Sequence, residues 1–462
     1  MIPRTVKDYL DSHQADHLAS LCQLLRIPSV ANVHDQPDAC QAAAQCLERY
    51  LQRLGMEVQL MPVCPPGEVD RPNVFARLHV SDALPTLLIY GHYDVQPAEP
   101  LNKWTTPPFG PAVRDGKLFA RGASDDKGQT FAHLMAIEAF LRTSTPLPVN
   151  IKVLLEGMEE IGSPHMAPFM EANKALLAAD AVVISDSEFF APGLPSITYA
   201  LRGMAAFEVI FQGPAADLHS GLHGGVIRNP VNALARFVAS LHDGHGRVTI
   251  PGFYEGVAEI SEGERRAWAT LPYNALAHAA GAGVKQLWSG EEPYGHLERL
   301  WARPTLDCNG IVGGYAGAGS KTIIPSQASV KFSTRLVGGQ DPARIVDCIR
   351  QYVRANTPEG IDSTLLVHTA SPAVELATDS PAMRAAQAAL EEAFGRKPAM
   401  VRCGASIPIA GMFKTILGVD SVLMGLGLPT DNLHSPDEHL ELEQLWRGSR
   451  AAAALMQALA GK

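Results

Sequence analysis

The sequence lacks the marks of a membrane protein and of an exported protein. No stretch approaches the roughly 20 consecutive apolar residues that a membrane-spanning helix needs. Residues 1–18 are polar and contain no apolar core of the kind found in signal peptides. We therefore predict a protein without a membrane partner.

Cysteine is also scarce. The seven cysteines are an odd number, are scattered along the sequence and include no Cys-x-x-Cys pair. A chain of 462 residues can bury a deep apolar core without disulfides. The cysteines are therefore expected to be mostly buried thiols in a reducing compartment, which predicts a cytoplasmic protein.

The chain also has no excess of basic residues. Lys and Arg total 38 against 48 Asp and Glu, which gives a net charge of −10, and the charges are dispersed. This balance argues against nucleic acid and against an anionic membrane surface as partners. Hydrophobic residues make up 46% and charged residues 19% of the chain, an ordinary globular composition that excludes disordered and fibrous classes.

What is present is an alternation of short apolar runs and amphipathic runs in the first 199 residues. The apolar runs predict strands over residues 73–80, 86–90, 149–155 and 181–185. The amphipathic runs predict helices over residues 39–54, 129–142 and 166–177. Such alternation favours an α/β fold with a mostly parallel sheet that is covered by helices.

The pattern changes near residue 200 and changes back near residue 372. In between, strands are predicted over residues 204–212 and 328–337, and helices over residues 231–242 and 342–355. Residues 251–319 show no clear period. The α/β pattern then returns with a helix over 380–394, a strand over 421–425 and a helix from 442. We predict one domain formed by residues 1–199 and 372–462, into which a domain of residues 200–371 is inserted.

Acidic and histidine residues gather where the predicted apolar strands end. The clusters, in sequence order, are His92 with Asp94, Asp125 with Asp126, Glu159 with Glu160, and Asp186, and His434 joins them later. A single acid at a strand end is most often a helix cap or a turn former. Ligands bind at the carboxyl ends of strands in open α/β sheets, however, and four clusters in succession are hard to explain as caps.

The residue types in these clusters favour a metal-assisted hydrolase. Imidazole and carboxylate ligands without a thiolate suit zinc, or manganese and cobalt in the same geometry. One aspartate can bridge two metal ions about 4 Å apart through its two oxygens. Where two glutamates are adjacent, as at Glu159 and Glu160, one can bind metal while the other remains a general base for water.

Five motifs extend this interpretation to a known family. They are Gly91-His-Tyr-Asp-Val-Gln-Pro97, Trp104-Thr-Thr-Pro-Pro-Phe109, Arg121-Gly-Ala-Ser-Asp-Asp-Lys-Gly128, Glu156-Gly-Met-Glu-Glu160 and Leu218-His-Ser-Gly-Leu-His-Gly-Gly225. Through them the chain resembles, over essentially its whole length, the dinuclear-zinc metallopeptidase family of carnosinases, non-specific dipeptidases, aminoacylases and desuccinylases. The form of the first two motifs and the length look like the carnosinase-like dipeptidase branch.

The resemblance implies a role for each clustered residue. His92 and Asp186 would bind one zinc ion, Glu160 and His434 the second, and Asp125 would bridge the two through a carboxylate that precedes a cis peptide bond. The general base would be Glu159. Asp94 would orient the imidazole of His92 from behind.

The resemblance also gives the inserted α+β domain a function as a lid and as the dimerisation domain of a homodimer. His219 would reach the active site of the partner subunit and stabilise the oxyanion, whereas without the family it reads as a surface histidine. Arg335 would bind the terminal carboxylate of the substrate in a bidentate pair, the alternative being a surface arginine paired with a local acid. Gly404 and Ser406 lie in a loop, residues 404–408, that would help to bind the same carboxylate.

The chain departs from the family pattern at Cys403, at Ala405, where relatives have a second Gly, and at Ala120, where relatives also have Gly. Relatives often carry Glu or Ser at the position of Cys403, which supplies neither that charge nor a strong acceptor. The glycine-rich stretch of residues 310–319 lacks the Lys-Ser/Thr ending of a phosphate-binding loop, which argues against a nucleotide site. The resemblance implies that this stretch lies near the substrate, as a close-approach loop in the lid.

We therefore predict hydrolysis of dipeptides by a metal-activated water, with two zinc ions per subunit and with manganese or cobalt as possible substitutes. The alternative enzyme is an N-acyl amino acid amidohydrolase that uses the same site, because the metal ligands do not define the substrate pocket. A catalytically silent scaffold protein is a third hypothesis, against which the complete set of ligands and the base argue.

Overall fold

The computed structural model describes residues 1–31 and 37–461, for Pro37 the backbone alone. The chain forms two compact units. The first unit contains residues 1–199, 376–401 and 409–462, and the second contains residues 200–375 and 402–408. Within the described residues, no helix combines the length and the apolar character that crossing a membrane requires.

The first unit contains a large mixed sheet, with strands in the order β1-β2-β6-β3-β7-β17-β8. The bounds are β1 (Glu57–Met61), β2 (Asn73–Leu78), β3 (Thr86–His92), β6 (Asn150–Glu156), β7 (Ala181–Ile184), β17 (Ser421–Leu423) and β8 (Ser196–Leu201). The central strands β6, β3, β7 and β17 are parallel, whereas β1, β2 and β8 run antiparallel to their neighbours. The predicted α/β fold with a mostly parallel sheet is thus confirmed.

The first unit also contains a small three-stranded sheet and strand β16 (Ala399–Cys403). The small sheet has the order β18-β5-β4, with β18 (His439–Glu441), β5 (Lys117–Phe119) and β4 (Ala112–Arg114). Strand β16 pairs with β8, and both strands run across the division between the units.

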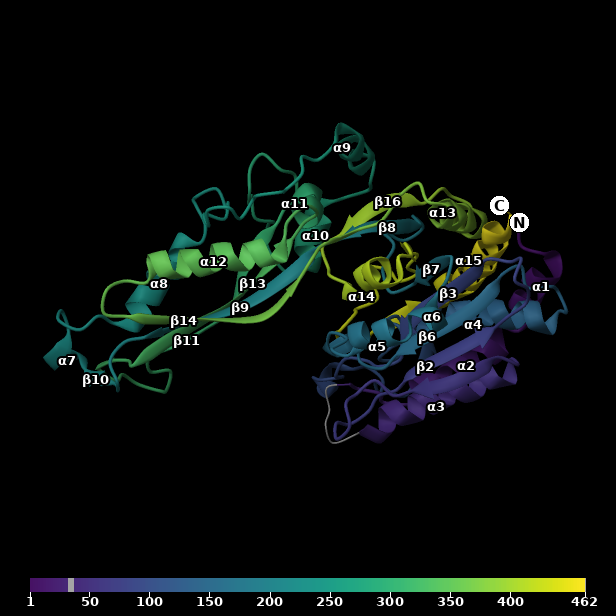
Figure 1. Cartoon of the computed structure of the whole chain (residues 1–462), viewed down its shortest axis with the longest axis horizontal. Coiled ribbons are helices and arrows are strands. Elements are labelled where there is room, and N and C mark those ends of the chain that lie inside the picture. The colour runs from purple at the N-terminus through teal and green to yellow at the C-terminus, as the bar shows by residue number, and fades with distance from the viewer. Residues whose placement is uncertain (32–36, 462) are drawn as a thin grey trace. The chain divides into compact units, whose positions relative to one another are not determined.

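The first unit also contains α-helices, which are labelled in Figure 1. They are α1 (Arg4–Ser12), α2 (Gln14–Leu25), α3 (Pro37–Arg53), α4 (Lys127–Arg142), α5 (Met166–Ala172), α6 (Lys174–Leu177), α13 (Pro381–Phe394), α14 (Pro408–Met412) and α15 (Leu442–Ala460), with short turns η1 (Leu101–Lys103), η2 (Glu159–Ile161) and η3 (Phe413–Leu417). Helix α4 is buried almost all round, as expected of a helix with apolar or small residues on every face.

One predicted helix of this unit is divided in two. Residues 166–177 form α5 and α6, which are separated at Asn173. The side-chain amide of Asn173 donates a hydrogen bond to the carbonyl of Phe169 at 2.8 Å. The backbone amide of Asn173 also donates to that carbonyl, at 3.1 Å, so the break coincides with the backbone of Asn173 itself, which has φ −116° and ψ 22°. The apolar period does not show this feature.

The second unit is built on a four-stranded antiparallel sheet with the order β11-β13-β9-β14. The bounds are β11 (Thr305–Gly313), β13 (Gln327–Leu336), β9 (Gly203–Gln212) and β14 (Asp362–Ser371), and short pairs involve β10 (Leu218–His219), β12 (Ile323–Ile324) and β15 (Val374–Glu375). In β9, buried and half-buried residues alternate strictly, which is the pattern of a strand with one face on a core. Figure 1 shows α8 (Pro230–Ser240) and α12 (Pro342–Asn356) on one side of this sheet.

The stretch without a clear period holds three short helices and one strand. The helices are α9 (Glu262–Ala269), α10 (Ala275–Gly281) and α11 (His296–Ala302), and a one-turn helix, α7 (Ser220–His223), precedes this stretch. The predicted loop over residues 310–319 is wrong in its first part, because residues up to Gly313 belong to β11. A Cβ on Gly313 would lie 2.8 Å from the Cβ of Ala328 on β13, so glycine here permits close strand approach.

Residues 402–408 belong to the second unit, whereas the sequence analysis assigned all of residues 372–462 to the first domain. The guanidinium of Arg402 explains part of this difference. It donates to Glu264 at 3.0 Å and to Glu375 at 3.2 Å, and both carboxylates lie in the second unit. Ion pairs between residues far apart in sequence leave no periodic signal.

Candidate metal centre

The candidate site lies at the carboxyl edge of the parallel strands in the first unit. Strand β3 ends on His92, β6 is followed after two residues by Glu159, and β7 is followed after one by Asp186. Parallel strands end at the same edge, so the three loops converge there. Asp125 precedes α4, and its peptide bond to Asp126 is cis.

Asp125 lies between two imidazole rings. Its Oδ1 is 3.1 Å from Nε2 of His92, and its Oδ2 is 2.9 Å from Nε2 of His434. The same nitrogen of His434 is 3.4 Å from a carboxylate oxygen of Glu160, and Nε2 of His92 is 3.9 Å from a carboxylate oxygen of Asp186. The structure thus gathers five side chains that lie more than 340 residues apart at the extremes of the sequence.

This donor set suits a divalent cation. Two overlapping groups, His92 with Asp125 and Glu160 and His92 with Glu159 and Asp186, each offer ligand atoms that lie within 4.8 Å of one another. Every donor is an imidazole nitrogen or a carboxylate oxygen, and both are normal ligands of zinc and manganese. The residues present therefore fit the metal ions that the sequence predicts.

The electrostatics of the cluster support the same conclusion. Burial, together with the charge of Asp125, raises the pKa of Glu160 to about 8 and that of Asp186 to about 6. Burial and the charges of Asp186 and Asp94 also raise the pKa of Glu159 well above its ordinary value. Crowded carboxylates of this kind hold more negative charge than two imidazoles offset, and a bound divalent cation removes that repulsion.

Asp94 has a wider role than the sequence suggested. Its side chain is fully buried, and Oδ1 lies 3.5 Å from Nδ1 of His92. The same carboxylate accepts hydrogen bonds from the backbone amides of Glu159 at 3.2 Å and Glu160 at 3.0 Å. Asp94 therefore positions the turn that carries both glutamates as well as the imidazole.

Glu438 is a positioning residue that the sequence analysis missed. This buried carboxylate accepts hydrogen bonds from the guanidinium of Arg121 at 2.7 Å and from the amides of Gly122, Ser124 and Asp125 at 3.0–3.1 Å. It thereby holds the loop that presents Asp125. The sequence carried only a weak sign of this role. Glu438 is an acid four residues after His434, and Arg121 is a basic residue at the start of the motif around Asp125.

The residues expected to bind substrate lie in the second unit. Nη1 of Arg335 donates to Oγ of Ser406 at 2.9 Å, and that hydroxyl donates to the carbonyl of Arg202 at 2.6 Å. Nε of Arg202 donates to the carbonyl of Gly404 at 2.9 Å. Arg335, Ser406 and Gly404 thus come together around Arg202, which the sequence analysis did not single out.

Arg202 makes this cluster more cationic than the sequence indicated. Burial and the neighbouring charge of Arg335 lower the pKa of Arg202 to about 10. Two guanidinium groups held this close suit an anionic ligand, which would relieve their repulsion.

His219 lies at the end of β10, where its side chain is exposed. Nδ1 of its ring accepts a hydrogen bond from the amide of Gly221 at 3.0 Å, so the imidazole caps the one-turn helix α7. This bond leaves Nε2 as the ring nitrogen that carries the proton and can act as a donor.

Comparison with known proteins identifies the family. The sequence model of peptidase family M20/M25/M40 matches residues 88–458, and the chain belongs to this family. This confirms the family resemblance noted in the sequence.

Individual relatives support the same family assignment. The chain is 33% identical to the Cys-Gly metallodipeptidase DUG1 of Candida albicans, over 96% of this chain and 94% of that protein. It is 31% identical to the Beta-Ala-His dipeptidase of Homo sapiens, over 98% and 92%. The crystal structure of human carnosine dipeptidase 1 superposes with a TM-score of 0.86 at 30% identity and covers 100% of both chains.

Proposed function

We propose that this protein is a metal-dependent dipeptidase with two divalent ions, preferentially zinc, at the candidate metal centre. The observation that carries the proposal is Asp125, whose two oxygens face the imidazoles of His92 and His434 at 3.1 and 2.9 Å. A carboxylate placed in this way suits a bridge between two ions. Relatives of similar length are named as dipeptidases, which favours dipeptides over N-acyl amino acids as substrates.

The distances divide the remaining ligands between the two ions. Asp186 lies beside His92, and Glu160 lies beside His434, so each ion would take one imidazole and one carboxylate in addition to Asp125. When bound, the ions supply an electrophile for the scissile carbonyl and lower the pKa of water. Manganese or cobalt would fit the same donors.

Glu159 is proposed as the general base. Its side chain is half-buried, and desolvation together with the charges of Asp186 and Asp94 raises its pKa well above the ordinary value. It would take a proton from the attacking water and give it to the amine that leaves. Asp94 holds the backbone of Glu159, so the carboxylate is positioned before substrate arrives.

Arg335, Ser406 and Arg202 are proposed to bind the terminal carboxylate of the substrate. Arg335 and Ser406 already share a hydrogen bond, and a carboxylate could replace it with charge-assisted bonds to both side chains. Gly404 contributes by its backbone, which anchors Arg202.

The second unit is proposed to be the lid and to form a homodimer, in which His219 stabilises the oxyanion in the partner subunit. Large apolar side chains at the surface support an interface: Ile311 and Val312 on the edge strand β11 are 61% and 69% exposed. Near His219, Leu222 and Val226 are also exposed. Exposed apolar groups on an edge strand are normally covered by another chain.

The cytoplasmic location remains a prediction. All seven cysteines lie within the described residues and no disulfide joins them, but only Cys40 and Cys348 are buried, so the expectation of mostly buried thiols was wrong.

A substrate panel tests the proposed activity. The protein, reconstituted in parallel with zinc and with manganese, is assayed against Cys-Gly, β-Ala-His and a set of other dipeptides, and against the N-acetyl forms of the same amino acids. We expect turnover of dipeptides that exceeds turnover of N-acetyl amino acids. The opposite order would replace the dipeptidase with an amidohydrolase, and no turnover of either class by the metal-loaded protein would indicate a silent scaffold.

A further inference from the structure

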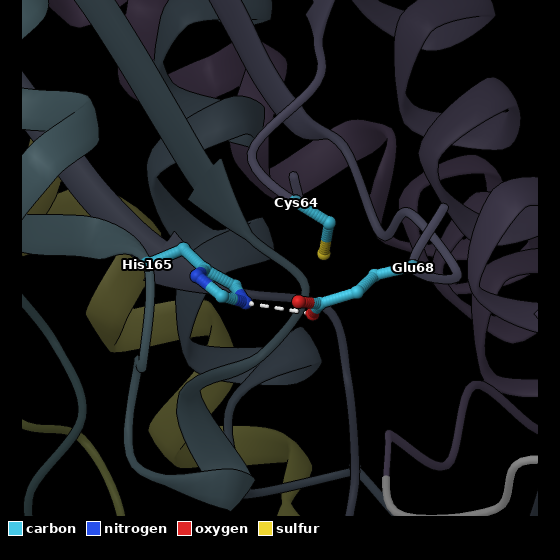
Figure 2. Close-up of side chains that lie close together, drawn as sticks. All are labelled: Cys64, Glu68 and His165. Carbon is cyan, nitrogen blue, oxygen red and sulfur yellow. Dashed lines mark ion pairs between the residues drawn. The ribbon is translucent and has the colours of Figure 1, made fainter. Parts of the chain in front are cut away.

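A second group of metal-binding side chains lies in the first unit and shares no residue with the candidate metal centre. Cys64 and Glu68 belong to the connection between β1 and β2, and His165 immediately precedes α5 (Figure 2). The sulfur of Cys64, a carboxylate oxygen of Glu68 and a ring nitrogen of His165 all lie within 4.8 Å of one another. We propose that these three side chains bind one further divalent cation of the zinc class.

The connection between β1 and β2 holds Cys64 and Glu68 on the same side of a tight turn. Oδ1 of Asp70 accepts hydrogen bonds from the amides of Val63 at 3.0 Å and Cys64 at 3.1 Å. The amide of Glu68 donates to the carbonyl of Pro65 at 3.1 Å. The backbone that carries both ligands is therefore fixed by local hydrogen bonds.

His165 approaches from a separate loop. Its Nε2 lies 3.4 Å from a carboxylate oxygen of Glu68, as the dashed line in Figure 2 marks. The carbonyl of His165 accepts a hydrogen bond from the amide of Phe169 at 3.1 Å, which ties the residue to the first turn of α5. The side chains of His165 and Glu68 are 24% and 58% exposed, so an ion can reach the cluster from solvent.

The donor set differs in kind from that of the metal centre. A thiolate, an imidazole and a carboxylate are together typical of zinc, whereas calcium and magnesium prefer oxygen ligands alone. Ligand atoms around a tetrahedral zinc ion lie about 3.5 Å apart, because each is about 2.0–2.3 Å from the metal. Small rotations of the Glu68 and His165 side chains would bring the three ligand atoms from their present spacing, within 4.8 Å, to about this distance. Binding would release the thiol proton of Cys64 to solvent and leave a fourth position for water.

The cluster also contacts the segment that carries the two adjacent glutamates. The sulfur of Cys64 lies 3.6 Å from Sδ of Met158, the residue before Glu159. The carbonyl of Met158 accepts a hydrogen bond from the amide of Ser163, two residues before His165. An ion bound to Cys64 and His165 would therefore restrain both ends of the segment from residue 158 to residue 165.

Cobalt distinguishes this site from the metal centre, because only cobalt bound to a thiolate gives a sulfur-to-metal charge-transfer band in the near ultraviolet. The full-length protein is titrated with Co²⁺ under a reductant that does not bind metal. We expect a final band intensity that corresponds to about one thiolate-bound cobalt ion per chain, in addition to cobalt bound at the metal centre. The band should vanish in Cys64→Ser and weaken in Glu68→Gln and His165→Asn. Added Zn²⁺ should abolish it by displacement.

Matched controls are available on the same chain. Cys308→Ser removes an exposed thiol of the second unit, and His79→Asn removes an exposed histidine that pairs with Asp82 at 3.3 Å. Both variants should keep the band. A wild-type protein without the band, or a band that survives Cys64→Ser, would overturn the proposal. Should Cys64→Ser fail to fold, a band of unchanged strength in both Glu68→Gln and His165→Asn would overturn it equally. None of these measurements depends on dipeptide hydrolysis. A negative result here can therefore be told apart from failure of the proposed function.

Discussion

Both units bury apolar side chains, and the buried charges of the second unit include the pair of Arg303 and Glu291, but the first unit concentrates its buried charges in one cluster. In the first unit, charged groups lie at the centre: His92, Asp94, Asp126 and Glu438 are at most 1% exposed. In the second unit, the core cluster consists of apolar residues from the inner face of one sheet and from the helices above it, among them Phe207 and Phe332. Buried charge lowers stability unless it is paired, whereas buried apolar surface raises it.

This difference separates the metal centre of the first unit from the apolar core of the second. The first unit tolerates a concentration of carboxylates that folding alone would not favour. The second unit has the regular alternation expected where packing decides each position. Substitutions in the buried charged cluster of the first unit should therefore change activity or metal binding, and substitutions in the apolar core of the second should chiefly change stability.

The largest effect is expected from Glu159→Gln. This change removes the proposed base but retains the size of the side chain, so hydrolysis should fall by about 10²- to 10⁴-fold. Metal content per chain should stay at the wild-type value, as measured by elemental analysis. Glu171→Gln, which alters an exposed glutamate of the same unit, serves as the control and should keep full activity. Near-normal turnover of Glu159→Gln would refute the assigned role.

Glu438→Gln should cost stability and metal affinity together. The variant leaves the guanidinium of Arg121, 1% exposed, without its charged partner, and breaking such a buried pair costs about 3–5 kcal/mol. The loop before Asp125 should loosen, so zinc affinity measured by competition with a chelator should fall. Glu443→Gln disrupts an exposed pair with Arg447 and should change neither quantity. Equal stability of the two variants would contradict the positioning role of Glu438.

Phe332→Ala should show the opposite combination in the second unit. Phe332 is 1% exposed and stacks on Phe207 with ring centroids 5.2 Å apart. Its truncation should lower the free energy of unfolding by about 3–5 kcal/mol in urea titrations. The folded variant should retain wild-type metal content. Tyr315→Ala, at a residue 47% exposed, should have little effect on stability. Loss of metal from folded Phe332→Ala protein would break the contrast between the units.

Among the four substitutions, Arg335→Ala should have the smallest effect in free energy. Loss of a charge-assisted bond to the substrate carboxylate is worth about 1.5–3 kcal/mol, which corresponds to a rise in KM of about 10- to 150-fold. Dipeptide amides, which lack that carboxylate, should be hydrolysed equally by variant and wild type. Arg344→Ala, at an exposed arginine paired with Glu255, is the control. A KM that rises as much for the amides would show that Arg335 acts on structure instead of on the carboxylate.

Much of the first unit could be predicted from the sequence because its signals are local. Apolar runs predicted β2, β3, β6 and β7 within a few residues, and the polar residues that follow them are the ones that converge. The division of α5 from α6 was missed, since it lies at the backbone of Asn173, which leaves the helical region without interrupting the apolar pattern. In the second unit, β11 was missed because its glycines conceal a strand pattern that only pairing with β13 makes evident.

The sequence by itself determined most strands of the parallel sheet, the order of the metal-binding residues and the family, because strand periods and short motifs are encoded by neighbouring residues. Only the tertiary structure decided that Glu438 holds the loop of Asp125, that Arg202 joins Arg335 and Ser406, and that Cys64 and Glu68 meet His165. In each case the partners lie about 70 residues or more apart in the sequence. Such contacts follow from how the elements pack, and no local pattern specifies them.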